Sequence, residues 1–330
     1  MAKFFRVETA DRPDLAAIGA ISQLDVKGYA FPKIFPILTV GEKSGTIACA
    51  PAGLSESKGA KGRTNGTALS GTDIVPVDVN WSVTRYEGRG QLYEDDGAAY
   101  ASAEAADGAG AELSQRLAWN YVESDAFAKI FTATRKSGAT ELSDHAVVKT
   151  LQKKAKTLRK YGRPALVMTI STWYDFVEIP EIRYRLEKFA GAGSDIGFLA
   201  TDVEKVLTAV STLLAFDQII LFDNDIVDAG GTYDGCIAVI GLRQTNGRVL
   251  DTIKSKATYG WCPVYLPDAA TSDSPFDMRT WYDNGNKCNV YDAEAFLGIV
   301  EAFSAGVAMT KLAASYSEYA VPEVTVSTGT

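Results

Sequence analysis

The longest helical pattern in the sequence covers residues 109–134, and it limits what this chain can fold into. Apolar side chains recur there at the spacing of one helix face: Leu113, Leu117, Tyr121, Phe127, Ile130 and Phe131. Polar residues mostly fall on the other side: Glu112, Gln115, Arg116, Glu123 and Lys129. Gly138 follows the pattern, where helices often end. Such a helix would be roughly 38 Å long, about twice the average, so it predicts a structural scaffold or the core helix of a large α/β enzyme.

The composition allows a substantial core but does not fit a typical nucleic-acid reader. Apolar residues make up 46% of the 330 residues, which is enough for two or three compact units or one large elongated unit. The net charge is −8, whereas a free nucleic-acid-binding chain usually has a basic excess on one face. A chain this acidic can still line a container around nucleic acid if its few basic patches all face inward.

Nothing in the sequence indicates a membrane or an oxidising compartment. No apolar run reaches membrane-spanning length, and the charged N-terminal stretch lacks the apolar core of a signal peptide. The cysteines are Cys49, Cys236, Cys262 and Cys288, without a C-x-x-C pair or a zinc-like spacing. We therefore expect free thiols, buried as small apolar residues in a cytosolic protein.

The motifs of most catalytic and cofactor sites are absent from the sequence. Its one histidine, His145, excludes a His-rich metal site and gives little support to a Ser-His-Asp triad. There is no G-x-S-x-G, no P-loop and no G-x-G-x-x-G. We therefore expect no catalytic residue, no cofactor and no metal ligand.

The acidic stretch Asp223–Asp228 is the one segment that invites a chemical role. Its carboxylates are clustered, but their positions and the lack of a closing Glu do not fit a twelve-residue calcium loop. An acidic turn is the preferred interpretation. An α/β enzyme in which Asp223, Asp225 and Asp228 divide the acid and base roles stays open as an alternative.

The first part of the chain predicts an arm followed by a long extended hairpin. Residues 1–30 are mixed in charge, with a short helix expected at Pro13–Gln23. Prolines favour an extended conformation for Phe31–Val40, and Thr46–Ala50 is its expected hairpin partner.

A polar loop and its return strand complete this hairpin. Residues 51–73 have almost nothing to bury, and a strand follows from Ile74 to Glu87. Loops of more than about 15 residues are uncommon unless they have a function. Lys58, Lys61 and Arg63 are interpreted as a solvated tip, because the spacing of a phosphate-binding loop is absent.

Residues 144–161 predict a helix that carries the most basic stretch of the chain. The expected inner face is apolar: Val147, Val148, Leu151, Ala155 and Leu158. The outer face is basic: Lys149, Lys153, Lys154, Lys156, Arg159 and Lys160. A solvated face is the preferred interpretation, and contact with nucleic acid or an acidic neighbour is the alternative.

Residues 163–240 predict a compact α/β lobe. Strands are expected at 165–170, 218–222 and 236–240, and helices at 180–189 and 201–214.

The last third predicts more strands and then a helix. The strands are Thr258–Leu266, Met278–Tyr282 and Cys288–Tyr291, of which the last two flank an Asn-Gly turn. An alanine-rich helix is expected over Ala293–Ala314, with a polar tail after Tyr319.

The order of these elements resembles the major capsid protein of tailed bacteriophages, whose Hong Kong 97-like fold is shared with encapsulins. The segments that carry the resemblance are Phe35–Val40, Trp81–Glu87, the long helix, Ala165–Trp173 and Phe216–Asp225. The resemblance implies an α+β fold with an N-terminal arm, an extended loop, a peripheral domain with a long spine helix, and an axial α/β domain. The implied segments are 1–40 (arm and first strand), 41–90 (extended loop), 91–162 (peripheral domain), 163–260 (axial domain) and 261–330 (return to the peripheral domain, C-terminal helix and tail).

The resemblance also implies a function and partners. The chain would assemble as pentamers and hexamers into the icosahedral head of a virion, in the host cytoplasm, around double-stranded DNA held by non-specific contacts. Portal and decoration proteins would be further partners, and about 30 residues before the first strand favour a separate scaffolding protein. No membrane and no enzyme activity are expected. An encapsulin shell with protein cargo is the alternative.

Some members of this family cross-link a loop lysine to an asparagine of a neighbour. Residues of the matching types are present: Lys43, Lys58, Lys61, Asn284, Asn286 and Asn289. Lysines at an exposed tip need no such explanation, so this bond is not predicted.

Overall fold

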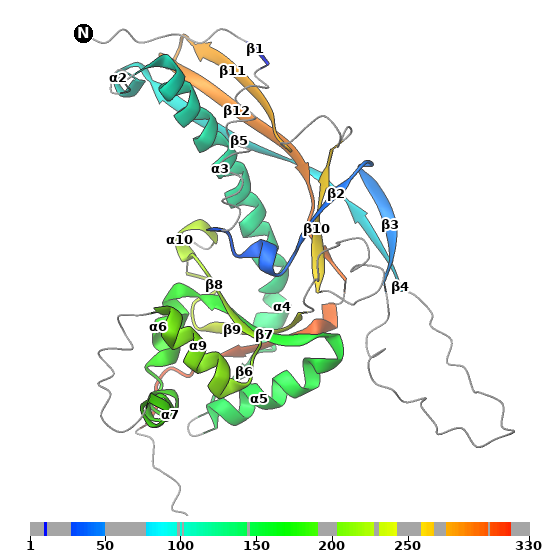
Figure 1. Cartoon of the computed structure of the whole chain (residues 1–330), viewed down its shortest axis with the longest axis vertical. Coiled ribbons are helices and arrows are strands. Elements are labelled where there is room, and N and C mark those ends of the chain that lie inside the picture. Colours follow the sequence, from blue (N-terminus) through cyan, green and yellow to red (C-terminus); the bar gives the residue numbers. More distant parts are fainter. Residues whose placement is uncertain are drawn as a thin grey trace, which may run out of the picture.

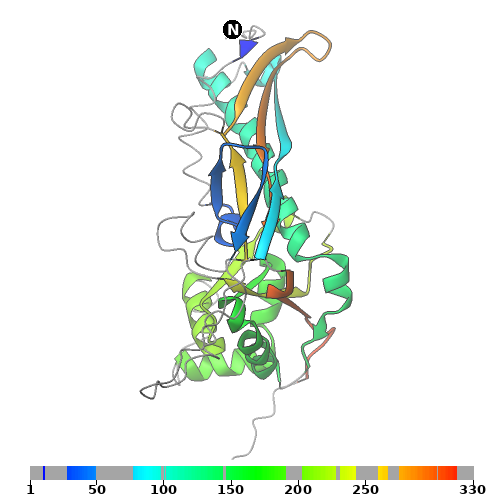
Figure 2. The same ribbon diagram turned by 90° about the vertical axis from the view of Figure 1, so that its right-hand side faces the viewer.

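The protein is an elongated molecule with a β-sheet in each half and one long helix that joins the halves (Figures 1 and 2). The computed structural model describes residues 10–11, 28–49, 77–97, 100, 102–143, 146–190, 203–227, 231–242, 259–266, 275–302 and 304–317. None of the helices in these ranges combines the length and the apolar character needed to cross a membrane.

The described elements follow one another in mixed order. The helices are α2 (Glu94–Gly97), α3 (Ala103–Ile130), α4 (Ala133–Ser137), α5 (Val147–Leu158), α6 (Ile170–Val177), α7 (Pro180–Ala190), α9 (Val203–Leu214) and α10 (Asn224–Val227), with 3-10 turns η2 (Phe31–Lys33), η3 (Arg159–Tyr161) and η4 (Ser304–Gly306). The strands are β1 (Ala10–Asp11), β2 (Ile37–Val40), β3 (Ser44–Cys49), β4 (Val77–Ser82), β5 (Thr84–Tyr93), β6 (Thr140–Glu141), β7 (Arg163–Thr169), β8 (Gln218–Phe222), β9 (Cys236–Leu242), β10 (Gly260–Tyr265), β11 (Asp277–Asp283), β12 (Cys288–Leu297), β13 (Val300–Glu301) and β14 (Val307–Lys311).

The seven-stranded sheet is built around β12. Its main path is β1-β11-β12-β10-β13, while β5 also pairs with β12 and β2 with β10. The antiparallel pairing of β12 and β5 runs from Cys288↔Tyr93 to Leu297↔Thr84. Helix α3 packs along one face of this sheet, against β5 and β12.

Helix α3 lies unusually close to the sheet because glycines and small side chains form the contact. A Cβ atom on Gly88 of β5 would lie 1.8 Å from the carbonyl oxygen of Ser114, and one on Gly110 would lie 2.3 Å from the Tyr291 ring. The buried face of α3 therefore contains mainly small residues near the sheet, such as Ala111, Ser114 and Ala118.

The predicted inner face of the long helix is wrong over its first half. Leu113 and Tyr121 are 43% and 59% exposed, whereas Phe127, Ile130 and Phe131 are buried as predicted. Leu113 is large, and the close contact with β5 admits only small side chains at the neighbouring positions.

The limits of the long helix also differ from the prediction. It begins at Ala103, where the Ser102 hydroxyl accepts a hydrogen bond from the Ala105 amide at 3.1 Å, so Gly108 and Gly110 lie inside the helix. It ends at Ile130, and α4 begins after Thr132, whose hydroxyl accepts from the Arg135 amide at 3.3 Å.

The segment before β2 is not extended as predicted. Phe31 starts a 3-10 turn with Pro32 near its beginning, and the Phe31 and Phe35 rings are buried in the main core. Strand β2 pairs in parallel with β10, and β3 pairs with β4. The predicted pairing of Thr46–Ala50 with this segment is therefore wrong, while the hairpin of β3 with its return strand is confirmed. The expected helix at Pro13–Gln23 lies outside the described residues.

The five-stranded sheet has the order β6-β14-β9-β7-β8 and forms the second half of the molecule. Strands β7, β8 and β9 and helices α7 and α9 confirm the predicted α/β lobe. On one face, Leu166 and Met168 pack under α5, α7 and α9. On the other face, Phe222 stacks on Phe127 of α3 with ring centroids 3.9 Å apart, which joins the two halves.

Helix α5 packs on this second sheet. It contacts β7, β9 and β14. Its predicted faces are confirmed, because Val147, Val148, Leu151, Ala155 and Leu158 are all buried while most of its basic side chains are exposed.

The predicted C-terminal helix over Ala293–Ala314 is wrong. Strand β12 continues to Leu297, β13 and η4 follow, and β14 pairs with β9 in the five-stranded sheet. Gly298 allows the chain to pass the Ser82 carbonyl oxygen, which would lie 2.5 Å from an added Cβ. Strand pairing therefore overrides the local helix propensity of the alanines. The tail after Tyr319 lies outside the described residues.

The predicted hairpin between β11 and β12 is confirmed. Asp283 pairs with Cys288 at its end, and Lys287 adopts a positive φ of 51°. The Asp283 carboxylate accepts hydrogen bonds from the Gly285 amide at 2.8 Å and from the Asn286 side chain at 2.7 Å, which fixes the turn.

Candidate functional site

The structure gives the acidic stretch at the end of β8 no metal-site geometry among the residues it describes. Asp223 is exposed, and the side chains of Asp225 and Asp228 lie outside the described residues, as does His145. In the described part of the chain, no three or more His, Cys, Asp or Glu side chains are grouped so that they could hold a metal ion.

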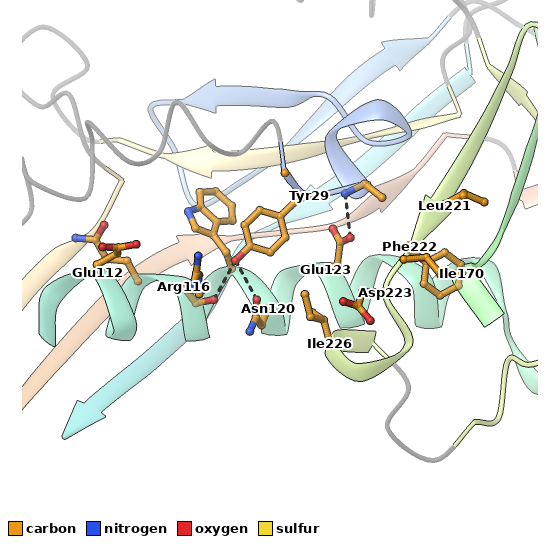
Figure 3. A pocket seen from close by; sticks show the side chains of 14 residues that line it. Tyr29, Glu112, Arg116, Asn120, Glu123, Ile170, Leu221, Phe222, Asp223 and Ile226 are labelled. Carbon is orange, nitrogen blue, oxygen red and sulfur yellow. Dashed lines mark hydrogen bonds between the residues drawn. The ribbon is translucent and has the colours of Figure 1, made fainter. Parts of the chain in front are cut away.

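A groove with a volume of about 560 Å³ runs along α3. It lies between α3, the segment just before η2, and the turn from β8 to α10 (Figure 3). Its walls are formed by Gly28, Tyr29, Ala30, Glu112, Gln115, Arg116, Trp119, Asn120, Glu123, Ile170, Leu221, Phe222, Asp223 and Ile226. The groove thus collects residues from both halves of the molecule.

Glu123 anchors the segment before η2 to the long helix. Its two carboxylate oxygens accept hydrogen bonds from the Ala30 and Phe31 amides, each at 2.9 Å (Figure 3). The side chain is buried, and this burial raises the pKa of Glu123 although the two amides oppose the shift. The sequence prediction placed Glu123 on the solvent side, so its role was missed.

Tyr29 lines the groove beside Glu123. Its hydroxyl lies 2.9 Å from Asn120 Oδ1 and donates to that oxygen, and the Arg116 carbonyl oxygen is 3.3 Å away (Figure 3). Burial raises the pKa of Tyr29 to about 12, so the phenol stays protonated near neutral pH.

The walls of the groove combine apolar, polar and charged side chains. Its described walls contain no Ser, Thr, Cys, His or Lys side chain, but the carboxylates of Glu112, Glu123 and Asp223 belong to a type that can act as a nucleophile. Ile170 and Ile226 are large apolar side chains that remain partly exposed at the groove. Such a mixture of apolar surface and backbone-binding carboxylate is typical of a binding surface.

A second polar cluster lies where the two halves meet. The Arg135 guanidinium donates to Glu301 Oε1 at 3.0 Å, to the Tyr259 hydroxyl at 3.3 Å and to the Ser304 carbonyl oxygen at 3.0 Å. The Tyr259 hydroxyl in turn donates to Glu301 at 2.6 Å. Burial and the Glu301 carboxylate raise the pKa of Tyr259. This cluster ties α4 to β13 and to the connection that leads to β14.

The residues considered for cross-linking do not form a site in the described structure. Lys43 lies over the Phe296 ring, with Nζ 3.7 Å from its centroid. Asn289 is buried within the sheet, and Asn284 and Asn286 lie in the β11–β12 turn. Lys58 and Lys61 lie outside the described residues, as does Arg63.

The described cysteines are free thiols. Cys262 and Cys288 are buried, as predicted, whereas Cys236 is half-buried. Burial raises the pKa of the Cys262 thiol to about 12, which makes it a poor nucleophile. The side chain of Cys49 lies outside the described residues.

Comparison with solved structures defines the fold class. A phage-related protein from Bordetella bronchiseptica RB50 matches with a TM-score of 0.56 and 11% identity, over 92% of this chain and 98% of that chain. The satellite phage P4 procapsid matches with a TM-score of 0.50 and 7% identity, over 97% and 95% of the two chains. The capsid of cyanophage P-SCSP1u gives a TM-score of 0.48 and 10% identity, over 87% and 89%.

The chain therefore has the α+β fold of phage capsid proteins over nearly its whole length, as the order of its elements predicts. No protein-family model matches the sequence, and curated protein sequences give no significant match. The likeness thus lies in the arrangement of the elements and not in shared motifs.

Proposed function

We propose that this chain is the major capsid protein of a tailed double-stranded DNA phage and assembles into its icosahedral head. The observation that supports this most is the match to the satellite phage P4 procapsid, which covers 97% of this chain with the same fold.

The β3–β4 hairpin is the part that we expect to lie on a neighbouring copy. It forms a two-stranded sheet at one side of the elongated molecule (Figure 1). At its base, Trp81 packs in a small cluster with Leu38, Trp261 and Val300. An isolated two-stranded sheet is marginally stable in water, so burial against a second chain would stabilise it.

We assign the two halves to the two domains of a capsid subunit. The half with α3 and the seven-stranded sheet would be the peripheral domain, preceded by the arm (1–40) and the extended loop (41–90). The half with the five-stranded sheet would be the axial domain, which meets its copies around five- and six-fold centres. Because β14 belongs to that sheet and α5 packs on it, we extend the axial domain beyond residues 163–260.

Assembly from many weak contacts follows from this arrangement. A head-to-tail contact that closes builds rings, and rings of five and six copies build a shell. Multivalency then allows each contact to be weak. We propose a separate scaffolding protein, portal and decoration proteins, and packaged DNA as further partners, within a virion that is assembled in the host cytoplasm.

Electron microscopy of the purified chain, with size-exclusion chromatography, tests the proposal. Closed shells or rings of five or six copies are expected, with and without a coexpressed scaffolding protein. A monodisperse species of 35.4 kDa at high concentration under both conditions would contradict it. Particles from infected cells that hold protein and no nucleic acid would favour an encapsulin shell instead.

A shortened variant provides the matched control. Cys49 pairs with Val77, so replacing residues 50–76 by Asn-Gly closes the β3–β4 pair with a two-residue turn. We expect this variant to fold with an unchanged circular dichroism spectrum but to form no closed shells. Shells of normal size from this variant would show that residues 50–76 are not needed for assembly.

A further inference from the structure

One surface of the second half carries a row of lysines that form no salt bridge with the carboxylates of the described residues. Lys149, Lys153, Lys156 and Lys160 recur along α5 and η3 at steps of four, three and four residues, which places them in one row. We call these four residues the lysine row. It is about 16 Å long, since a helix rises about 1.5 Å per residue. No Asp or Glu occurs between Val147 and Tyr161.

The ion pairs described on this half involve other residues. Arg163 pairs with Asp217 at 3.0 Å, and Lys311 pairs with Glu141 at 3.5 Å. Lys154, beside the row, instead donates to the Thr140 hydroxyl and the Met309 carbonyl oxygen, both at 3.2 Å. No carboxylate of the described residues forms a salt bridge with the row.

Repulsion among the four lysines of the row destabilises helix α5. Like charges four residues apart weaken a helix. Helix α5 is held by its inner face, where Val147, Leu151 and Leu158 are buried against the sheet and its neighbouring helices. An anion that covers the row would remove the repulsion.

The composition of this face favours duplex DNA over a protein surface. Its exposed residues are Lys149, Gln152, Lys153, Lys156, Thr157, Arg159 and Lys160, with no aromatic or aliphatic side chain among them. Protein interfaces are depleted in lysine and enriched in aromatic residues and methionine. Duplex DNA presents about one negative charge per 1.7 Å of its length, so a row of this length can meet several phosphates.

The charge of the rest of the chain disfavours contact with DNA. The net charge of −8 means that the chain as a whole repels DNA. The exposed side of α3 mixes both signs, with Glu112, Asp125 and Lys129. A DNA contact must therefore concentrate on a local basic face, and α5 lies on the outside of the five-stranded sheet where it is accessible (Figure 1).

We propose that the lysine row on α5 holds the phosphate backbone of duplex DNA without reading its sequence. This inference rests on the proposed function, because it places α5 on the side of the shell that faces the packaged DNA. Lysines act on phosphates as point charges, which suits contact without a fixed register.

Salt-dependent binding tests the inference. Full-length protein is titrated into a fluorescent mixed-sequence duplex of about 30 base pairs between about 50 and 200 mM NaCl. Four phosphate contacts predict a slope of about −3.6 in log K against log salt, which is about a 150-fold loss over this range. One variant replaces the whole lysine row by Gln.

The matched control changes the same charge elsewhere. It replaces Lys129, Lys188, Lys205 and Lys287 by Gln, all of which are exposed. We expect the row variant to lose most of the slope and at least about 100-fold in affinity at low salt, and the control to retain the slope. Equal losses in both variants, or no binding of the unchanged protein at low salt, would overturn the inference.

Shell formation, followed by electron microscopy of the same preparations, keeps the two proposals apart. If the row variant binds DNA normally but no longer assembles, the row contacts another copy and the DNA inference fails. If every variant assembles and only the row variant loses the slope, both proposals stand. If none assembles and only the row variant loses the slope, the DNA surface stands and the capsid proposal fails.

Discussion

Replacing Gly88 by Ala should separate the long helix from its sheet. A Cβ atom at this position would lie 1.8 Å from the Ser114 carbonyl oxygen and 2.6 Å from the Ala118 amide nitrogen. Contacts of a real Cβ below 3.0 Å essentially never occur, so the backbones of α3 and β5 must move apart by at least 1.2 Å, the difference between 3.0 and 1.8 Å. Both obstructing atoms belong to the backbone, and no side-chain rotation can relieve them.

The expected loss of stability is large for one methyl group. Overpacking in a well-packed core typically costs about 1–3 kcal/mol, and a clash with helix backbone should lie at or above the upper end. At about 2 °C per kcal/mol for a protein of this size, the melting temperature should fall by at least about 6 °C. Differential scanning calorimetry of the full chain in its unassembled state measures this shift.

Gly108 provides the matched control within the same helix. It has nothing within 4 Å of an added Cβ. Gly108→Ala should therefore raise the melting temperature by about 1–2 °C, because alanine favours a helix interior by about 0.5–1 kcal/mol over glycine. An unchanged melting temperature in Gly88→Ala, or equal losses in both variants, would refute the close contact between α3 and β5.

Further predictions concern the two polar clusters. Glu123→Ala leaves the buried Ala30 and Phe31 amides without their acceptor. In urea titrations, this substitution should lower the free energy of unfolding by about 2–4 kcal/mol, and a loss below about 1 kcal/mol would show that water replaces the carboxylate. The raised pKa of Glu123 means that the folded state binds the carboxyl proton more tightly than the unfolded state does. The stability of the unchanged protein relative to Glu123→Gln should therefore fall as pH rises from about 4.5 through the folded pKa, and then stay constant. A rise in relative stability over this range would contradict the shift. A lysine at position 135 cannot reach all the acceptors of the guanidinium, so Arg135→Lys should lower the free energy of unfolding by about 2–3 kcal/mol. Tyr259→Phe should lower it by only about 1 kcal/mol. Equal losses in the two variants would argue against the guanidinium as the centre of the cluster.

Local patterns were sufficient to predict the central strands β7, β8 and β9 and the helices α7 and α9 of the five-stranded half. Strands β7, β8 and β9 each contain a continuous apolar run, and Pro180 begins α7 at a position where proline is tolerated. Each of these signals lies within the element itself, so no knowledge of distant contacts was needed.

The errors share one physical cause, which is a partner far away in the sequence. The buried face of α3 is decided by glycines of β5, so the positions of Leu113 and Tyr121 cannot be judged from the helix alone. Similarly, β12 extends to Leu297 because it pairs with residues around Thr84. Tertiary pairing over such separations overrides local propensity.

The polar clusters were missed for a related reason. Glu123 and Arg135 look like ordinary surface charges, and their partners are the Ala30 and Phe31 amides and Glu301. One signal was present for Glu123, because it follows Val122 and precedes Ala126 and Phe127 within the apolar spacing of the helix. A charge in such a position needs a buried partner.

The position of β14 has a consequence for the synthesis of the chain. This strand, Val307–Lys311, lies between β6 and β9, so the five-stranded sheet cannot be completed until residue 311 has left the ribosome. Until then, one edge of β9 lacks its neighbour and is open to pairing with other chains. A nascent or prematurely terminated subunit therefore has an incomplete sheet in the half that we expect to meet its neighbours. This favours the incorporation of full-length subunits.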